Sequence, residues 1–231
     1  SDDPKNKGKY RTPYNLIDSL ALKLSQTNFQ MNTHAIGDEA NHSVLKIYNK
    51  VLKDKPDPRW RVEHSQIVSS EDFKLFNSKI IPSIQPAHAT SDMYWADERL
   101  GYERLKDGGY AYKRLLDWSG TIALGTDFPV EKINPFHTFY SAVARKDLMG
   151  YPVSGFQKEN SLSRYEALMG MTLWAAHANF EENEKGSIEV GKFADFVILD
   201  RNIMKVDEKD IPTTKVVATI LGGQIVYSNR F

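Results

Sequence analysis

The chain has no cysteine, no excess of charge of either sign and no long apolar run. Without cysteine it forms no disulfide and offers no thiolate to a metal ion. Lysine and arginine together number 30, and so do aspartate and glutamate. This balance argues against a nucleic-acid partner, because nucleic-acid binders carry a basic excess or stripe. No stretch approaches the roughly 18 consecutive apolar residues of a membrane span, so we expect no membrane partner.

The residues that are present are typical of a globular protein. The 231 residues are 41% hydrophobic, which is enough for a large core in one or two domains. Three lysines near the start, Lys5, Lys7 and Lys9, indicate a solvated tail. The opening Ser1-Asp2-Asp3 shows no signal-peptide pattern and is typical of a fragment rather than of the start of a gene product, so the compartment stays open.

Strand-like and helix-like segments alternate through the first 183 residues. Apolar residues at helical spacing predict helices over 15–25, 38–52, 110–119, 135–145 and 163–176, and a shorter one around Phe73 that Ser70-Glu71-Asp72 can cap. Ser163 and Glu166 form a capping-box pattern at the start of the last helix. Strands are predicted over 29–33, 60–63, 80–85 and 121–125. The polar and aromatic stretch 88–110 is predicted to be a long loop.

The pattern changes after Asn183. Segments 187–190, 193–199 and 216–227 are rich in β-forming residues and are separated by glycines. We therefore predict an all-β segment at the end of the chain.

Three of the predicted strands end in a residue type that binds metal ions. His34 follows the first strand, His64 the second and Asp127 the fourth. His34 and His64 stand about 30 residues apart, close to the roughly 31 residues that each unit of a (β/α)₈ barrel occupies. Four successive parallel strands are therefore predicted, with chemistry at their carboxyl ends.

Imidazoles and a carboxylate together suit a borderline cation such as Zn²⁺. A carboxylate beside such a cation can also take a proton from metal-bound water. Each residue alone has a plainer explanation, because a histidine at a strand end often has a structural hydrogen bond and an aspartate after Gly-Thr often forms a turn or a helix N-cap. The pattern of residues therefore leaves both a metal site and structural roles open.

Four short motifs, in order, carry a resemblance to a known family. They are His-Ala-Ile-Gly-Asp at 34–38, Arg-Val-Glu-His-Ser-Gln at 61–66, Gln-Pro-Ala-His at 85–88 and Gly-Thr-Asp-Phe-Pro-Val at 125–130. With the segments 186–200 and 216–227, the set resembles the amidohydrolase superfamily, in its amidohydrolase family 3 branch. Residues 1–10 are similar to that family's loop between the fourth and fifth barrel strands.

The resemblance implies an α/β fold: the C-terminal half of a (β/α)₈ TIM-type barrel, with strands five to eight in residues 1–183. It also implies that residues 184–231 are a segment of a small C-terminal β-domain, part of a composite β-sandwich. His34, His64 and Asp127 would be metal ligands, and Asp127 would also be the catalytic general base. His88 and Asp92 would face the substrate. Glu63, beside His64 on a strand, points to the opposite face and is predicted to be structural.

One part of the family pattern is missing. The family supplies a His-x-His pair from its first strand, and this sequence has none; His42, His137 and His177 lie in predicted helices and do not replace it. We therefore expect a truncated or domain-sized piece that docks with a missing N-terminal half or forms a homo-oligomer, because a four-strand half-barrel has two exposed edges. The cofactor would be zinc or another divalent metal, one or two ions in the full-length parent and possibly none in this fragment.

The sequence leaves three alternative functions open. The first is metal-dependent hydrolysis of a non-peptide C–N or amide bond in a small-molecule substrate, in the full-length parent and with the isolated fragment inactive. The second is a non-catalytic structural or interaction fragment without a complete metal site. A third places an aromatic or sugar-like ligand on the loop 88–110, although such a loop more often forms a lid over a barrel mouth.

Overall fold

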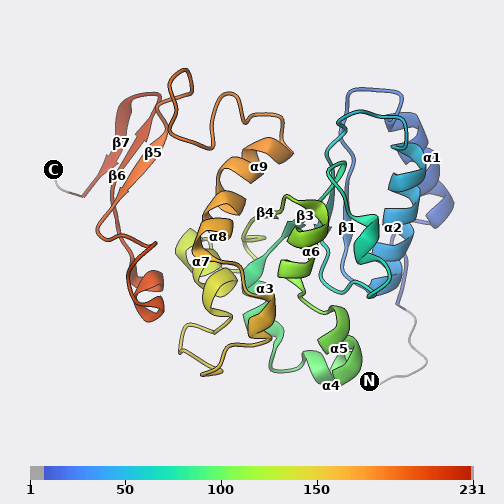
Figure 1. Ribbon diagram of the computed structural model, residues 1–231, viewed down its shortest axis with the longest axis horizontal. Coiled ribbons are helices and arrows are strands. Elements are labelled where there is room, and N and C mark those ends of the chain that lie inside the picture. The colour runs from blue at the N-terminus through green and yellow to red at the C-terminus, as the bar shows by residue number, and fades with distance from the viewer. Residues whose placement is uncertain (1–7, 230–231) are drawn as a thin grey trace.

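The computed structural model describes residues 8–229 and contains a parallel and an antiparallel sheet. The parallel sheet has four strands in the order β1-β2-β3-β4. They are β1 (Asn32–Ala35), β2 (Trp60–His64), β3 (Ile80–Ile84) and β4 (Ala123–Leu124) (Figure 1). Each strand pairs in parallel with the next one in the chain. The mixed α/β fold with successive parallel strands is therefore confirmed, although β4 is shorter than the predicted 121–125.

Helices cover one face of this sheet because their apolar stripes face it. These are α1 (Tyr14–Leu24), α2 (Asp38–Val51) and α6 (Tyr112–Ser119), with the short 3₁₀ turn η1 (Phe73–Leu75). On α2, the Tyr48 ring packs edge-on against the Trp60 ring of β2 at 4.9 Å, and its hydroxyl donates to the Met31 carbonyl at 2.9 Å. Full burial of a side chain of this size stabilises a fold by about 2 kcal/mol. The capped helix expected around Phe73 is only this 3₁₀ turn.

The stretch 88–110 is helical, so the prediction of a long loop is wrong. It forms α3 (Pro86–Asp92), α4 (Ala96–Leu100) and α5 (Tyr102–Gly108). Pro86 occupies the first turn of α3, where its missing N–H costs nothing. Gly101, at φ +79°, lets the chain reverse between α4 and α5. Helices of five to seven residues are too short to show a helical period in the sequence.

The helix predicted over 163–176 is two helices. Its start is confirmed: Ser163 and Glu166 form the capping box at the beginning of α8 (Arg164–Met171). Thr172 then leaves the helical conformation, at φ −127° and ψ −94°, and its hydroxyl donates to the Leu168 carbonyl at 2.7 Å. α9 (Leu173–Ala178) follows. Before α8 come α7 (Pro135–Ala144), which matches the predicted 135–145, and the 3₁₀ turn η2 (Lys158–Asn160).

The antiparallel sheet comprises three strands at the end of the chain: β5 (Phe196–Leu199), β6 (Val216–Leu221) and β7 (Gln224–Ser228), with the 3₁₀ turn η3 (Glu208–Thr213) before β6. Gly222 and Gly223, both at positive φ, make the two-residue turn between β6 and β7. The prediction of β-structure over 187–190 is wrong, because that segment contains no strand. Ile188 and Val190 stand exposed there, and no neighbouring strand pairs with them in the described chain.

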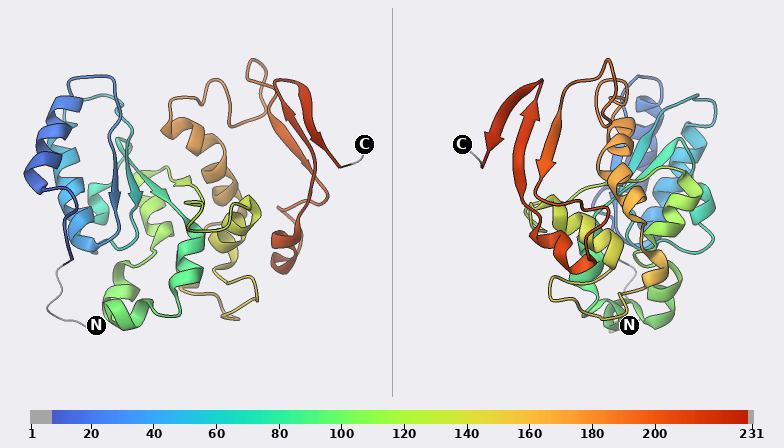
Figure 2. Two further views of the ribbon diagram at one scale, coloured as in Figure 1. Left: turned by 180° about the vertical axis from the view of Figure 1, so that it is seen from behind. Right: turned by 60° about the vertical axis from the view of Figure 1, so that its left-hand side comes forward.

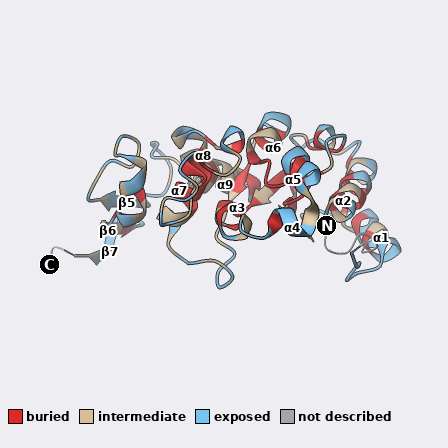
Figure 3. Ribbon diagram, turned by 90° about the horizontal axis from the view of Figure 1, so that it is seen from below, coloured by how far each residue is buried: buried red, intermediate tan, exposed pale blue. Residues whose placement is uncertain are grey.

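The two sheets lie apart, with α8 and α9 between them (Figures 1 and 2). Buried residues concentrate around the parallel sheet and its helices, whereas the antiparallel sheet is largely exposed (Figure 3). Among the described residues no helix is long and apolar enough to cross a membrane. Lys5, Lys7 and most of the segment 1–10 lie outside the described residues, while Lys9 is exposed as expected.

Candidate metal and catalytic site

Histidine and aspartate side chains meet at the carboxyl edge of the parallel sheet. His34 lies in β1, His64 is the last residue of β2, and Asp127 follows β4. His64 and Asp127 have left-handed backbone conformations, at φ +74° and +58°. Such conformations cost of order 1 kcal/mol or more in residues other than glycine, and they occur where the surrounding structure holds a functional side chain in place. The turns therefore direct these two side chains out of the regular strand alternation.

The side chains form a chain of contacts centred on His64. The His34 and His64 rings meet edge-on with centroids 4.5 Å apart, and the His64 and His88 rings stack at 5.8 Å. One ligand atom each from His64, His88 and Asp127 lies within 4.8 Å of the other two. The structure thus groups two of the three predicted ligands with His88, which the resemblance placed near the substrate. His34 contacts this cluster through the His64 ring.

The surroundings of His64 favour a neutral imidazole. Burial lowers the pKa of His64, and the neighbouring His34 lowers it further, while Asp127 opposes the shift. Its Nδ1 and Gln85 Oε1, just after β3, are buried without a hydrogen bond of regular geometry, although the Gln85 side chain interacts with the ring and raises the pKa of His64 slightly against the effect of burial.

His88 lies between two carboxylates. Its side chain is only 10% exposed, with Nε2 3.5 Å from Asp127 Oδ2 on one side. On the other side Nδ1 lies 3.0 Å from Glu131 Oε1, which also accepts a hydrogen bond from Ser91 Oγ at 2.6 Å. The sequence pattern does not single out Glu131. Its one sequence signal is a position four residues after Asp127, in the same turn.

Asp92 belongs to a neighbouring polar network. Its Oδ2 accepts hydrogen bonds from the Tyr110 hydroxyl at 2.8 Å and from Gln66 Nε2 at 3.1 Å. Burial raises the pKa of Asp92, and the hydrogen bond from Tyr110 partly opposes this. The network joins the end of α3 to the segment after β2, so Asp92 helps to fix the wall beside His88.

The other titratable side chains considered from sequence have structural surroundings. Glu63 accepts from Arg61 Nε at 3.2 Å, and Arg61 also donates to the Ala178 carbonyl at 2.8 Å, which ties β2 to α9. The His42 side chain pairs with Asp72 at 2.9 Å. His42, His137 and His177 lie in α2, α7 and α9, as the sequence indicated.

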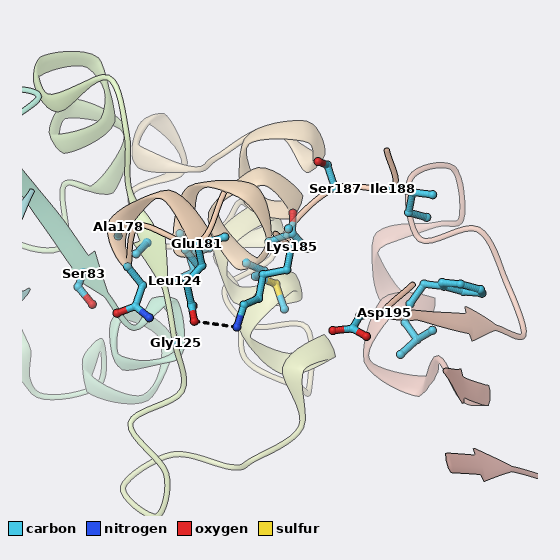
Figure 4. A pocket seen from close by; sticks show the side chains of 18 of the residues that line it. Ser83, Leu124, Gly125, Ala178, Glu181, Lys185, Ser187, Ile188 and Asp195 are labelled. Carbon is cyan, nitrogen blue, oxygen red and sulfur yellow. Dashed lines mark ion pairs between the residues drawn. The ribbon is translucent and has the colours of Figure 1, made fainter. Parts of the chain in front are cut away.

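A hollow of about 910 Å³ lies between the parallel sheet, α8, α9 and the antiparallel sheet (Figure 4). Glu63 and Ser83 line it from the parallel sheet, and an ion pair of 2.9 Å joins Lys185 and Glu181 at its wall. None of the clustered His64, His88 and Asp127 is among its described lining residues. Among the described residues the hollow holds no set of metal-binding atoms comparable to the strand-end cluster, so the chemistry points to that cluster.

The cluster fits a divalent metal ion. Two imidazole nitrogens and a carboxylate oxygen are three of the ligands that zinc takes in catalytic sites, which keep a further position for water or substrate. The exposure of the Asp127 side chain, at 39%, leaves room for water or substrate beside it. The same donor set suits other borderline divalent ions.

Comparison with known proteins gives the family context. The sequence profile of the amidohydrolase family matches residues 11–227. The chain is 33% identical to Protein LONG AFTER FAR-RED 3 of Arabidopsis thaliana over 229 residues, covering 98% of this chain and 39% of that protein. It is 24% identical to an N-substituted formamide deformylase of Arthrobacter pascens, covering 91% of this chain and 39% of that protein.

A solved structure is similar as well. The crystal structure of an uncharacterized metal-dependent hydrolase from Pyrococcus horikoshii superposes with a TM-score of 0.78 and 28% sequence identity, covering 90% of this chain and 41% of that one. The chain thus spans about two fifths of the length of these relatives.

Proposed function

The chain belongs to the amidohydrolase family, and we propose from this premise that it supplies half of the active site of a metal-dependent hydrolase acting on a non-peptide C–N bond of a small molecule. The observation that carries the proposal is the convergence of His64, His88 and Asp127 at the carboxyl edge of a parallel sheet. The relative from Arthrobacter pascens, named a deformylase of N-substituted formamides, supports an amide-type substrate.

The proposal includes the architecture. Residues 1–183 would be strands five to eight of a barrel and residues 184–231 a β-domain segment, with the remaining strands and a His-x-His pair supplied by another segment. Four parallel strands with helices on one face support this arrangement, because a closed barrel needs further strands to pair with β1 and β4.

His34, His64 and Asp127 are the proposed ligands, and the position of His88 makes it a further ligand or a contact to the substrate. Zinc, or another divalent ion, supplies Lewis-acid polarisation of the substrate carbonyl and an acidified water when it is bound. The chain's own residues do the remaining work. Burial lowers the pKa of His64, which favours the neutral imidazole with a free lone pair. Asp127 takes a proton from the attacking water at a carboxylate oxygen and returns it to the departing nitrogen.

The test is the variant Asp127→Asn in the protein that carries this chain together with its remaining strands. Removal of a general base of this kind lowers kcat by about 10²- to 10⁴-fold. Hydrolysis of an N-substituted formamide and of simple N-acyl amides, followed by release of the amine, measures this. Asp117→Asn is the matched control, because Asp117 is exposed on α6 and pairs only with Lys113 in the described ion pairs. Unchanged turnover in the Asp127→Asn variant would contradict the assignment of Asp127 as the general base.

A second candidate, an interaction module without catalysis, has one observation in its favour. The side chains of Phe196, Val197 and Ile198 on β5 are all exposed, so both faces of this strand lack cover in the described structure. An interaction module of this kind predicts that neither zinc binding nor hydrolysis changes when His64 or Asp127 is replaced.

A further inference from the structure

We propose that Glu131 is a positioning residue that fixes the tautomer and orientation of His88, so that His88 Nε2 presents its lone pair to the space shared with His64 and Asp127. The use of that lone pair in hydrolysis rests on the proposed function, but the positioning itself does not. No role in the sequence pattern or in the resemblance accounts for Glu131, yet its side chain is only 17% exposed and its Oε1 contacts His88 and Ser91 of α3.

The hydrogen-bond chemistry of the two partners sets the direction. An ionised carboxylate only accepts hydrogen bonds, so the 3.0 Å contact between His88 Nδ1 and Glu131 Oε1 requires the proton on Nδ1. In a neutral imidazole the other nitrogen then carries the lone pair. That nitrogen, Nε2, is the atom that faces Asp127 Oδ2 at 3.5 Å.

The distance on the Asp127 side agrees with this assignment. At 3.5 Å the two atoms are too far apart for a good hydrogen bond and close to the spacing of two groups that share a cation. A lone pair facing a carboxylate is unfavourable unless a positive or proton-bearing species lies between them. By holding the proton on Nδ1, Glu131 therefore leaves the His88 Nε2 lone pair free to bind a cation or accept a proton. Histidines that bind metals nearly always donate their second N–H to a carboxylate, a carbonyl or a water.

The carboxylate of Glu131 is itself held in place. Ser91 lies one turn after His88 on α3 and donates to the same Oε1 at 2.6 Å. Glu131 also lies in the turn that carries Asp127, whose carbonyl accepts from the Val130 N–H at 2.8 Å. The same short segment thus places Asp127 at Nε2 of the His88 ring and Glu131 at Nδ1.

The experiment observes the imidazole directly. Two-dimensional ¹H–¹⁵N NMR of ¹⁵N-histidine-labelled chain, without added metal and at a pH where His88 is neutral, distinguishes an Nδ1–H from an Nε2–H ring. We expect His88 to be the Nδ1–H form in the unaltered chain, to gain Nε2–H form in Glu131→Ala, and to retain mainly the Nδ1–H form in the near-isosteric Glu131→Gln, whose amide oxygen still accepts. Glu71→Gln, at an exposed glutamate, is the matched control and leaves the signal unchanged.

Zinc titration by calorimetry supplies the second readout. Loss of such an outer partner weakens metal binding by about 10- to 100-fold, and we expect a loss in this range for Glu131→Ala and a smaller one for Glu131→Gln. An Nε2–H ring in the unaltered chain, or an Nδ1–H ring that persists unchanged in Glu131→Ala, overturns the positioning role. The predicted tautomers without any zinc binding would support the positioning role and count against the proposed function, so the two failures are distinguishable.

Discussion

At the scale of single residues, Asp92 is a carboxyl group whose ionisation the fold opposes. Its pKa is raised, chiefly by burial, above the value of about 3.9 for an unfolded aspartate. The unfolded chain therefore releases this proton at a lower pH than the folded chain does. The contribution of Asp92 to stability is fully present below about pH 4 and is lost as the pH rises through the raised folded value.

Asp92→Asn removes this part of the pH dependence. The asparagine oxygen can still accept from Tyr110 and Gln66, so the network survives without the buried charge. Urea unfolding between pH 4 and pH 7 should show a smaller fall in stability for the variant than for the unaltered chain. Asp117→Asn, which alters an exposed carboxylate, is the control. Identical pH profiles for the Asp92→Asn variant and the unaltered chain would contradict the assigned burial effect.

The site residues differ in how far the sequence predicts them. His34, His64 and Asp127 stand at predicted strand ends, and parallel strands bring such ends to one edge of a sheet, so their proximity follows from the pattern. The close approach of His88 does not, because it depends on the unexpected helix α3. The position of Glu131 beside His88 requires the turn in which Asp127 has a positive φ. No residue type in the sequence predicts that backbone conformation.

At the scale of elements, the end of α5 packs tightly against the segment that follows β2. The Gly108 carbonyl accepts a hydrogen bond from the Val68 N–H at 3.0 Å. A Cβ added to Gly108 would lie 1.7 Å from the Val68 carbonyl oxygen, a backbone atom that cannot rotate away. This contact fixes α5 against the segment 64–68, which begins at His64.

Gly108→Ala should therefore destabilise the chain, because the clash outweighs the gain of about 1 kcal/mol that alanine brings to a helix. Overpacking of this kind costs about 1–3 kcal/mol, measured by urea unfolding. Gly125→Ala is the matched control, since a Cβ at Gly125 meets nothing within 4 Å. Equal stabilities for the two variants would show that α5 moves freely against the segment after β2.

Some elements differ from the prediction because local sequence patterns do not determine them. Pro86 starts α3 and Gly101 separates α4 from α5, and all three helices lack the length that makes a helical period visible. The longer α2 and the capped start of α8 were predictable because periodicity and cap chemistry are local. The segment 187–190 has strand-forming residues without a partner strand, and pairing is not a local property.

At the scale of the whole molecule, unpaired edges and exposed apolar strands call for a partner. β1 and β4 are the outer strands of the parallel sheet, and β5 and β7 those of the antiparallel sheet, within the described chain. Ile225, Val226 and Tyr227 on β7 are all exposed. Such surfaces pair with another chain or segment unless they are covered.

The isolated chain should therefore self-associate, with a mass above that of a monomer in size-exclusion chromatography with light scattering. Val226→Lys places a charge on β7 and should shift the distribution toward the monomer. Met149→Lys, which adds the same charge at an exposed methionine outside the sheet, is the control. A monodisperse monomer of the unaltered chain would show that these surfaces need no partner.

Elemental mass spectrometry of the purified chain shows whether the strand-end cluster of this amidohydrolase-family chain binds a metal ion. We predict near-stoichiometric zinc or another divalent metal in the unaltered chain, lost in His64→Ala and in Asp127→Asn and retained in His42→Ala, whose histidine pairs with Asp72 and not with the cluster. Metal at background level, or metal that persists in His64→Ala and Asp127→Asn, would contradict the claim.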